Sequence, residues 1–194
     1  MDKEEIRKSI KRRQLEDTLR EECLSTTSDR ITRYLELDFI KVTPNTHFAS
    51  ISAECILLYR DGYFFAYIAL CQAVAEALVR LICERNERGS PHFVKFETNI
   101  RKLKELRNKI PADWIEKFER IWENRNDYHH LNPEVPTQKE KLREIAKDKI
   151  VTLVDVESKV FAFDIVQGAI NPKHPQYWPK PQNGLLNVFL RFEP

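Results

Sequence analysis

An arginine and two histidines follow closely on an aromatic segment, and these residue types could together act on a phosphodiester. Arg125 and Asn126 come first, and His129 and His130 follow. A histidine titrates near neutral pH and can take or give a proton at a ribose 2′-hydroxyl or at a leaving oxygen. An arginine stays cationic and can stabilise charge that grows on phosphoryl oxygens. The asparagine can hydrogen-bond a phosphate. This combination of arginine, asparagine and histidine side chains is typical of metal-free RNA cleavage that leaves a 2′,3′-cyclic phosphate.

The segment from Pro111 onward is predicted to be a helix that carries this arginine. Its apolar residues form one helical stripe of about 100° per residue, and the next turn of the stripe reaches Arg125. A guanidinium cannot shed its charge, and burying it unpaired would be costly. We therefore expect Arg125 to be paired inside the protein, or to line a cleft or a subunit interface. The stripe consists of Trp114, Phe118, Ile121 and Trp122.

The two histidines are not equivalent on this predicted helix. On an ideal helix His130 lies about 140° from Arg125, whereas His129 lies about 40° away. Either the helix unwinds near Pro133, or a second subunit brings the groups together, or His129 is the working histidine. A polar helix end, where an imidazolium suits the helix dipole, is the alternative interpretation of the pair. A metal site with Asp127 is disfavoured, because no HxxxH, HxH or HExxH spacing is present.

Two strongly apolar helices are expected before this segment, over residues 45–60 and 63–85, joined by a tight turn. On the second, Gln72, Glu76 and Arg80 recur every four residues and mark one polar face. A membrane span would need about 20 apolar residues with few charges, so this helix is expected to lie in a soluble core.

Glu76 has two interpretations. It could form an ion pair with Arg80 one turn later on a solvated face. Alternatively, it could face the cleft and orient Arg125, because a carboxylate fits the guanidinium fork in a bidentate way.

Composition indicates a soluble helical protein. Charged residues make up 32% of the 194 residues and hydrophobic ones 42%, and only four residues are glycine. A net charge of +2 says little about partners.

The first twenty residues are densely charged and do not resemble a signal peptide, so a cytoplasmic, reducing location is expected. The four cysteines are then expected to be free thiols, with three of them buried; they are Cys23, Cys55, Cys71 and Cys83.

The fold class expected from these patterns is all-α, as an antiparallel helical bundle. An N-terminal arm helix is expected over residues 3–22, and residues 28–42 fit either a helix or a short strand. The last segment is rich in proline and could end in one strand over residues 185–192, which would pair with residues 37–42 or with another subunit. Two further helices are expected, one from Ser90-Pro91 to Lys109 and one from a capping box after Pro136 to about Ala169. The expected organisation is an arm and connector (1–44), a bundle (45–170) and a tail (171–194).

The stretch Arg125-Asn126-x-x-x-His130 resembles the RNxxxH form of the Rx4–6H motif of the HEPN superfamily. Its members are small helical bundle proteins, and many are metal-independent endoribonucleases of toxin–antitoxin, phage-defence and RNA-processing systems. The helix pair that carries Glu76 also resembles the family layout, and the similarity covers residues 45–170. The resemblance implies that Arg125 stabilises the transition state and that His130 is the acid/base, with Asn126 beside them. Supporting roles are expected for His129, Glu76, Tyr128 and Asp127.

The resemblance also implies partners. It implies an RNA substrate, a homodimer that brings two motifs into one cleft, and a cognate antitoxin or regulatory protein. It implies no cofactor, no metal and no membrane. Two functional hypotheses follow. The first is a HEPN-type endoribonuclease acting as a toxin or phage-defence effector, and the second is a non-catalytic HEPN-like module for nucleotide binding or protein interaction.

Overall fold

The computed structural model describes residues 2–86, 95–106 and 108–191 of the chain. It divides into two compact units, Met1–Glu36 and Leu37–Pro194. The first unit is a single helix, α1 (Lys3–Leu35), which begins with a capping box between Asp2 and Glu5. The expected arm helix is therefore longer than predicted, because it continues through the ambiguous residues 28–35. The expected start of a helix at Ser90-Pro91 lies outside the described residues.

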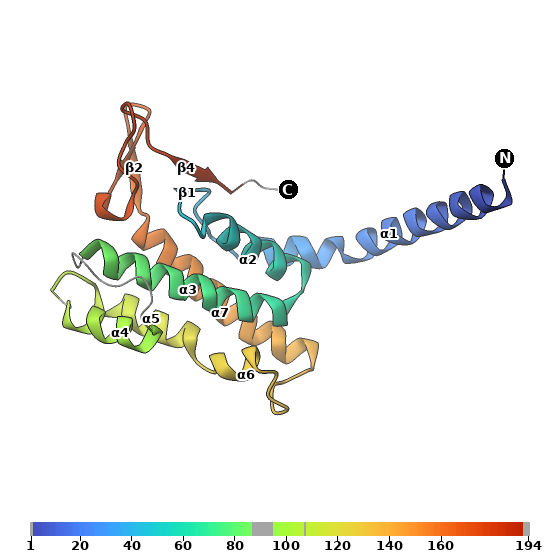
Figure 1. Cartoon of the computed structure of the whole chain (residues 1–194), viewed down its shortest axis with the longest axis horizontal. Coiled ribbons are helices and arrows are strands. Elements are labelled where there is room, and N and C mark those ends of the chain that lie inside the picture. Colours follow the sequence, from blue (N-terminus) through green and yellow to red (C-terminus); the bar gives the residue numbers. More distant parts are fainter. Residues whose placement is uncertain (1, 87–94, 107, 192–194) are drawn as a thin grey trace. The chain divides into compact units, whose positions relative to one another are not determined.

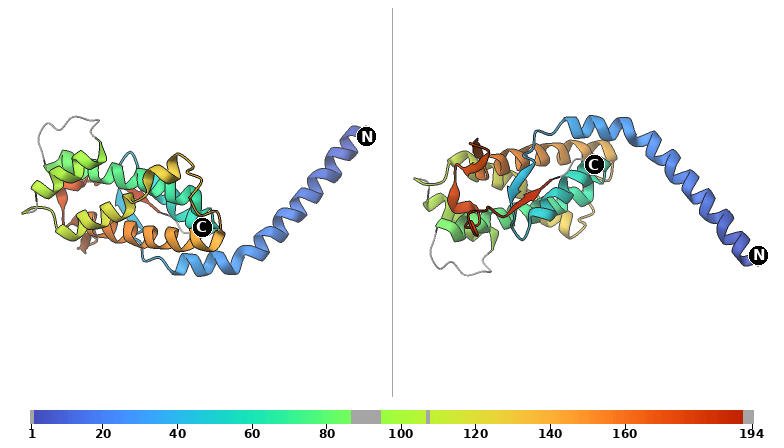
Figure 2. Two further views of the ribbon diagram at one scale, coloured as in Figure 1. Left: turned by 90° about the horizontal axis from the view of Figure 1, so that it is seen from below. Right: turned by 90° about the horizontal axis from the view of Figure 1, so that it is seen from above.

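The second unit is mostly helical, as the sequence predicted. Its longest helices are α3 (Phe64–Asn86) and α7 (Lys139–Val160), which pack against each other. Figure 1 and Figure 2 show α7 running alongside α3. The remaining helices are α2 (Ala49–Asp61), α4 (Phe96–Glu105), α5 (Ala112–Trp122) and α6 (Arg125–His129).

Helix α3 forms the centre of this unit, because α2, α4, α5, α6 and α7 all contact it. It is long and apolar enough to cross a membrane by length and composition alone. Its apolar side chains, among them Ile68, Leu78 and Ile82, are instead buried by the surrounding helices. The thiols of Cys71 and Cys83 are buried with them, as predicted. This burial is what the core helix of a soluble protein shows.

The strand expected near the C-terminus is present and pairs within the chain. Strand β4 (Val188–Leu190) is antiparallel to β1 (Val42–Pro44), with Thr43 opposite Phe189. The sequence left two partners open, residues 37–42 or another subunit, and the strand pairs within the chain with a segment that begins at Val42.

The prediction of a helix as far as Ala169 is wrong. Helix α7 ends at Val160, and a β-hairpin follows, made of β2 (Phe163–Val166) and β3 (Ala169–Pro172). Its two-residue turn is Gln167-Gly168, and both residues have positive φ, of 53° and 79°. Such a turn matches the twist of a hairpin and cannot continue a helix. Gly168 was the signal in the sequence for this turn.

The described part of the tail packs into the second unit. Tyr177 and Trp178 are buried, and Tyr177 lies in the short 3₁₀ helix η1 (Pro175–Tyr177), which contacts α3. Farther on, the Arg191 guanidinium donates to Glu157 Oε2 of α7 at 2.8 Å and to the Ser52 hydroxyl of α2 at 2.7 Å. The Arg191 and Glu157 side chains are only 3% and 2% exposed. The C-terminal segment therefore ties α2 to α7 through a buried ion pair.

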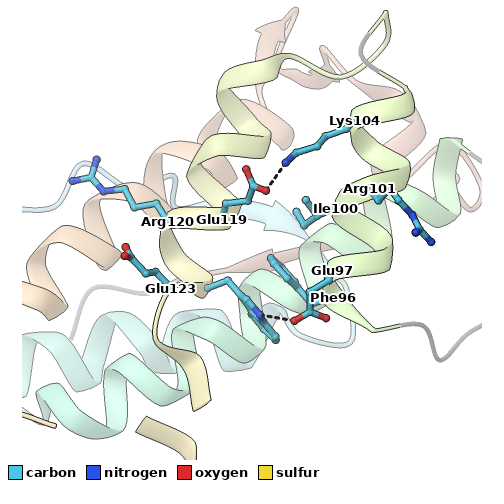
Figure 3. Close-up of a pocket in the computed structure, with 9 residues that line it drawn as sticks. Phe96, Glu97, Ile100, Arg101, Lys104, Glu119, Arg120 and Glu123 are labelled. Atoms are coloured by element: carbon cyan, nitrogen blue, oxygen red, sulfur yellow. Dashed lines mark hydrogen bonds and ion pairs between the residues drawn. The ribbon is translucent and has the colours of Figure 1, made fainter. Parts of the chain in front are cut away.

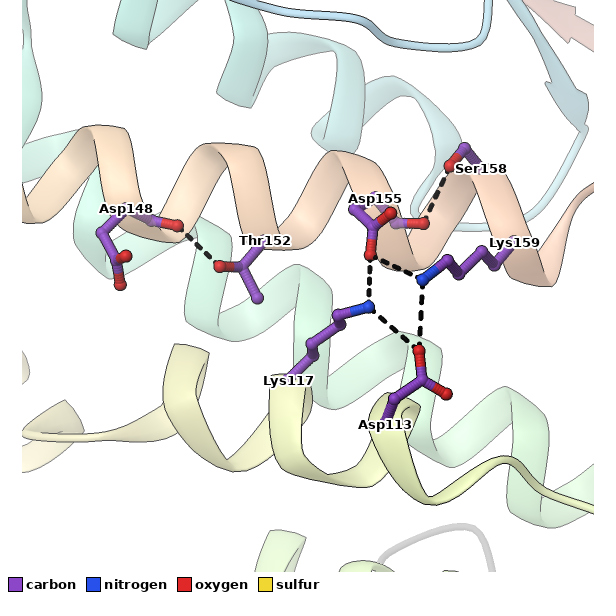
Figure 4. Close-up of polar contacts among 7 residues, drawn as sticks. All are labelled: Asp113, Lys117, Asp148, Thr152, Asp155, Ser158 and Lys159. Atoms are coloured by element: carbon purple, nitrogen blue, oxygen red, sulfur yellow. Dashed lines mark hydrogen bonds and ion pairs between the residues drawn. The ribbon is translucent and has the colours of Figure 1, made fainter.

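Ion pairs at the surface join α5 to its neighbours. Lys104 of α4 reaches Glu119 of α5 at 2.6 Å (Figure 3). On the other side, α5 and α7 share a cluster of alternating charges (Figure 4). In this cluster each of two lysines contacts both of two carboxylates, at distances of 2.5 to 3.1 Å. Its members are Asp113, Lys117, Asp155 and Lys159.

This cluster should make the free energy of unfolding depend on pH in the acid range. Burial alone would raise the pKa of Asp113 and Asp155, but hydrogen bonds from Lys117 and Lys159 lower it below 3.8. The stabilisation is therefore present above the unfolded-state pKa and is lost as the pH falls through the folded-state value. An Asp113→Asn/Asp155→Asn variant should be less stable than wild type at pH 6, by less than about 1 kcal/mol because the groups are exposed. Urea unfolding should find that difference diminished at pH 2.5, and an equal difference at both pH values would contradict this role.

Candidate functional site

The segment that carries Arg125 is not one continuous helix, and the prediction of a single helix from Pro111 is wrong. Helix α5 ends at Trp122, and Asn124 adopts a left-handed backbone conformation with φ of 59°. Helix α6 then begins at Arg125. Asparagine tolerates this conformation better than most residues and commonly follows a helix end. One break therefore lies before Arg125, and the helical segment also ends at His129, with Leu131 in a left-handed conformation of φ 52°, close to where unwinding was considered.

Two buried polar side chains hold this break in place. Lys149 of α7 is 5% exposed, and its ammonium donates to the carbonyl oxygens of Arg120, Ile121 and Glu123 at 3.3, 2.8 and 3.1 Å. Gln72 of α3 is fully buried, and its Nε2 donates to the Ile121 and Glu123 carbonyls at 3.2 Å each. These carbonyls lack partners within α5 because the helix ends there. A cation is also favoured at a helix C-terminus.

Burial lowers the pKa of Lys149 below its ordinary value, and the nearby Cys71 and Glu123 act in the opposite direction. The ammonium is held by carbonyl oxygens rather than by an ion pair. Lys149 and Gln72 thus form a clamp between α3, α5 and α7, and this clamp decides where Arg125 lies.

Removing the clamp cation should destabilise the protein. Lys149→Met keeps a long apolar stem but leaves the Arg120 carbonyl without its side-chain donor and weakens the pairing of two others. We expect a loss of about 2 kcal/mol in the free energy of unfolding, the scale of buried polar groups left unpaired. Lys141→Met, an exposed lysine on the same helix, should change it by less than about 0.5 kcal/mol. Urea denaturation of both variants measures this, and equal effects would exclude the clamp.

Arg125 is half-buried at the start of α6, and its guanidinium carbon lies 5.1 Å from the centre of the Trp122 ring. The distance is that of a cation–π contact. Its Nη1 donates to Asn126 Oδ1 at 3.3 Å. Within the described ranges no carboxylate lies within ion-pair distance of this guanidinium. Arg125 therefore keeps its charge available to an anionic ligand.

A cleft of about 860 Å³ lies beside this guanidinium. Arg125, Asn126 and Asp127 line one side, and Glu76 of α3 lines another. The predicted pairing of Glu76 with Arg80 is present at 3.2 Å, and Glu76 is also one of the residues that line the cleft. Both interpretations of Glu76 thus describe part of its position, although it does not contact Arg125 directly. The cleft also includes Lys95, Phe96, Glu97, Trp122, Glu123 and Asn124.

Neither histidine lines this cleft. His129 is exposed at the end of α6, and it lies close enough to Arg125 to feel its charge. Partial burial lowers the pKa of His129 below 6.5, Arg125 lowers it further, and the Ala69 backbone and Glu76 oppose these effects. This shift favours the neutral imidazole, which can accept a proton. His130 caps the helix and is exposed.

The other predicted residues of this segment have structural contacts. Tyr128 is 5% exposed and packs against Phe65 of α3, with ring centres 5.7 Å apart. It is the residue that fastens α6 to the core. Asp127 Oδ1 accepts a hydrogen bond from Asn132 Nδ2 at 3.0 Å, which closes the loop after α6.

Sequence reasoning missed the two clamp residues. Gln72 was assigned to a polar face but not to a role, and Lys149 was not singled out at all. The available signal was a lysine within the increasingly apolar part of α7. No group of three or more histidine, cysteine or acidic side chains that could hold a metal ion occurs among the residues that the structure describes.

The chain was also compared with known proteins. Neither protein-family models, nor curated proteins, nor solved structures yielded a match to it.

Proposed function

We propose that this protein is a metal-independent endoribonuclease of the HEPN type. The observation that supports the proposal best is Arg125, whose guanidinium lies at a cleft without a carboxylate partner in the described part of the chain. Such a cation can stabilise the charge that develops on phosphoryl oxygens when a ribose 2′-hydroxyl attacks the adjacent phosphate. The products are a 2′,3′-cyclic phosphate and a 5′-hydroxyl. In this proposal the second unit is an antiparallel HEPN-like bundle.

The histidine supplies proton transfer. The motif resemblance assigns this role to His130, which lies about 140° around an ideal helix from Arg125. We propose that two copies of the chain associate and that His130 of one copy serves Arg125 of the other. Within one chain His129 is the alternative, because Arg125 is close enough to lower its pKa, which favours the neutral imidazole. A cytoplasmic toxin or phage-defence effector, restrained by an antitoxin or regulatory protein, is the biological setting that the resemblance suggests.

The charge of the cleft bears on how RNA binds. Four carboxylates and two cations line it, so it does not offer a long basic track. Binding in this proposal depends on one or two phosphates at Arg125 and weakens only modestly with salt.

Mixing two inactive variants tests whether the site is shared between copies. Arg125→Ala and His130→Ala should each be inactive alone. If Arg125 and His130 act across a dimer, a heterodimer of the two variants contains one intact site. Co-refolded mixtures should then recover about a quarter of wild-type cleavage, since half of the dimers are mixed and each has one of two sites.

Mixtures that stay inactive while light scattering shows dimers would contradict the shared site. Activity that is lost in His129→Ala and retained in His130→Ala would transfer the acid/base role to His129.

The second candidate function is a non-catalytic module that binds nucleotides. The absence of both histidines from the cleft lining favours it, because Arg125 alone suffices to bind a phosphate. Binding of RNA by folded wild-type protein without any cleavage would support this candidate.

A further inference from the structure

Trp122, the last residue of α5, lies between Phe96 and Arg125. Its indole is stacked on Phe96 of α4, with ring centres 3.9 Å apart and planes 11° apart. Phe96 therefore covers one face of the indole. The Arg125 guanidinium, whose carbon lies over the ring at 5.1 Å from its centre, has the other face. We call these three side chains the Arg125 stack.

The indole in the middle of the Arg125 stack is fixed from several sides. Its Nε1–H donates to Glu97 Oε1 at 3.3 Å, which a dashed line marks in Figure 3. The backbone carbonyls on either side of Trp122 accept hydrogen bonds from the clamp residues Gln72 and Lys149. Phe96, which supports one face, is itself buried at 3% exposed. The position of the ring is therefore set by the core of the protein.

The indole is also the most rigid group that the Arg125 guanidinium contacts. Its hydrogen-bond partner is Asn126, which accepts from Nη1 at 3.3 Å and is exposed. A carboxylate in place of the indole would hold the guanidinium as well, but it would compete with phosphoryl oxygens for the same N–H donors. An aromatic ring attracts the cation without neutralising it. The Arg125 stack thus holds the arginine in place and leaves its charge for an anion.

We propose that Trp122 is a positioning residue, which holds the Arg125 guanidinium ready for a phosphate of the RNA. A long side chain has many rotamers, and ordering it only when the substrate arrives would weaken binding. In the Arg125 stack this ordering takes place when the protein folds. The guanidinium is then preorganised for the charge that develops on the phosphoryl oxygens. The proposal rests on the proposed function and adds to the site a residue that lies outside the RNxxxH motif.

An NMR measurement on the full-length protein tests the position of the guanidinium without any substrate. The ring current of an indole moves the resonance of a proton over its face upfield. The Nε–H proton of Arg125, identified by its absence in Arg125→Lys, should therefore resonate upfield of those of the exposed arginines on α1. Trp122→Leu should return it to their range, whereas Trp122→Phe keeps an aromatic ring and should retain part of the shift. The control Tyr63→Leu removes a 62% exposed aromatic outside the cleft and should leave the resonance unchanged.

A binding measurement tests whether this position matters to a phosphate. The probe is an RNA tetranucleotide with 2′-O-methyl groups, which cannot be cleaved by 2′-hydroxyl attack. Trp122→Leu should weaken its binding about 3- to 10-fold, the scale of ordering one long side chain on binding. Trp122→Phe should weaken it less, and Tyr63→Leu should not weaken it. In an Arg125→Ala background Trp122→Leu should have no further effect, because the side chain that it positions is gone. Calorimetric titration measures each affinity.

Three results would overturn the proposal. The first is an Arg125 Nε–H resonance that is not upfield in the wild type or does not move in Trp122→Leu. The second is a Trp122→Leu variant that binds like the wild type, or that loses the same affinity with and without Arg125, as a general structural role would produce. The third is a wild-type protein that does not bind the tetranucleotide, which would remove the proposed function as well. If Trp122→Leu does not fold, Trp122→Phe serves in the same comparisons with smaller expected changes.

Failure of this proposal is distinguishable from failure of the nuclease, because neither measurement involves cleavage. An upfield Nε–H resonance and an Arg125-dependent loss of binding, without cleavage of ordinary RNA, would keep the positioning role and remove the catalytic one. Cleavage that is lost in Arg125→Ala and unchanged in Trp122→Leu would keep the nuclease and remove the positioning role.

Discussion

Arg125→Ala should lower kcat/KM for RNA cleavage by about 1000-fold, while the protein stays folded. The estimate takes the guanidinium as the main preorganised group that stabilises the phosphoryl charge, a role whose loss costs 100- to 1000-fold in other enzymes. The free energy of unfolding should change by less than about 1 kcal/mol. Arg125 has no ion pair in the described ranges, and its contact with Trp122 at 5.1 Å is worth only about 0.5–1 kcal/mol.

Arg125→Lys distinguishes the contribution of the positive charge to activity from that of the planar guanidinium group. Lysine keeps the positive charge but loses the planar fork that can contact two phosphoryl oxygens. Its activity should therefore lie between that of the wild type and that of Arg125→Ala. Arg12→Ala on α1, where the arginine forms an exposed pair with Glu16, is the control for loss of an arginine. Equal loss of activity in the control would show that the effect is not specific to the cleft.

Arg191→Met should produce the largest loss of stability, of about 3–5 kcal/mol. It removes the cation from a buried pair and leaves the Glu157 carboxylate, 2% exposed, with the Ser52 hydroxyl as its one side-chain donor among the described residues. Breaking one side of a buried pair costs this much because the remaining charge is uncompensated. Urea unfolding followed by circular dichroism measures the change.

The double variant Glu157→Met/Arg191→Met distinguishes the net contribution of the ion pair to stability from the cost of a buried carboxylate that has lost its cation. It should recover most of the stability, since an apolar replacement of a buried pair is often neutral. The same substitution in an exposed pair, Arg12→Met on α1, should cost less than about 0.5 kcal/mol. A double variant as unstable as Arg191→Met would show that the loss comes from packing and not from the unpaired carboxylate.

The elements that sequence predicted best are those whose patterns are local and long. The helix predicted over residues 63–85 spans Phe64–Asn86, because its apolar side chains extend over six turns and the preceding turn contains Gly62. Gly62 has φ of 84°, a conformation that glycine adopts without strain. The need of the C-terminal strand for a partner was also predicted, because a lone strand must satisfy its backbone groups, but the sequence did not decide between a partner in the chain and another subunit.

The elements that sequence did not predict depend on residues far apart in the chain. The break before Arg125 is stabilised by Gln72 and Lys149, which lie 49 and 28 residues from Ile121 along the sequence. No periodicity reveals that their donors meet at one helix end. The apolar run of β2 is compatible with either a helix or a strand, and only Gly168 distinguished the two.

The candidate site was predicted in part. Arg125 was expected to be paired inside or to line a cleft or an interface, and it lines a cleft with Asn126, Asp127 and Glu76. The sequence places Trp122 and Arg125 three residues apart on one stripe, and their contact is present although an unpredicted helix break lies between them. The catalytic assignment of Arg125 and His130 remains a prediction from the motif.

The most direct measurement is cleavage of a mixed RNA pool by the purified protein in EDTA, beside Arg125→Ala and the Arg12→Ala control. The proposal predicts cleavage that persists in EDTA, leaves 2′,3′-cyclic phosphate ends, continues in Arg12→Ala and is lost in Arg125→Ala. Cleavage at the wild-type rate in a folded Arg125→Ala variant would contradict it. No cleavage by folded, dimeric wild-type protein on a pool of all tetranucleotide contexts would contradict it as well, and would favour the nucleotide-binding module.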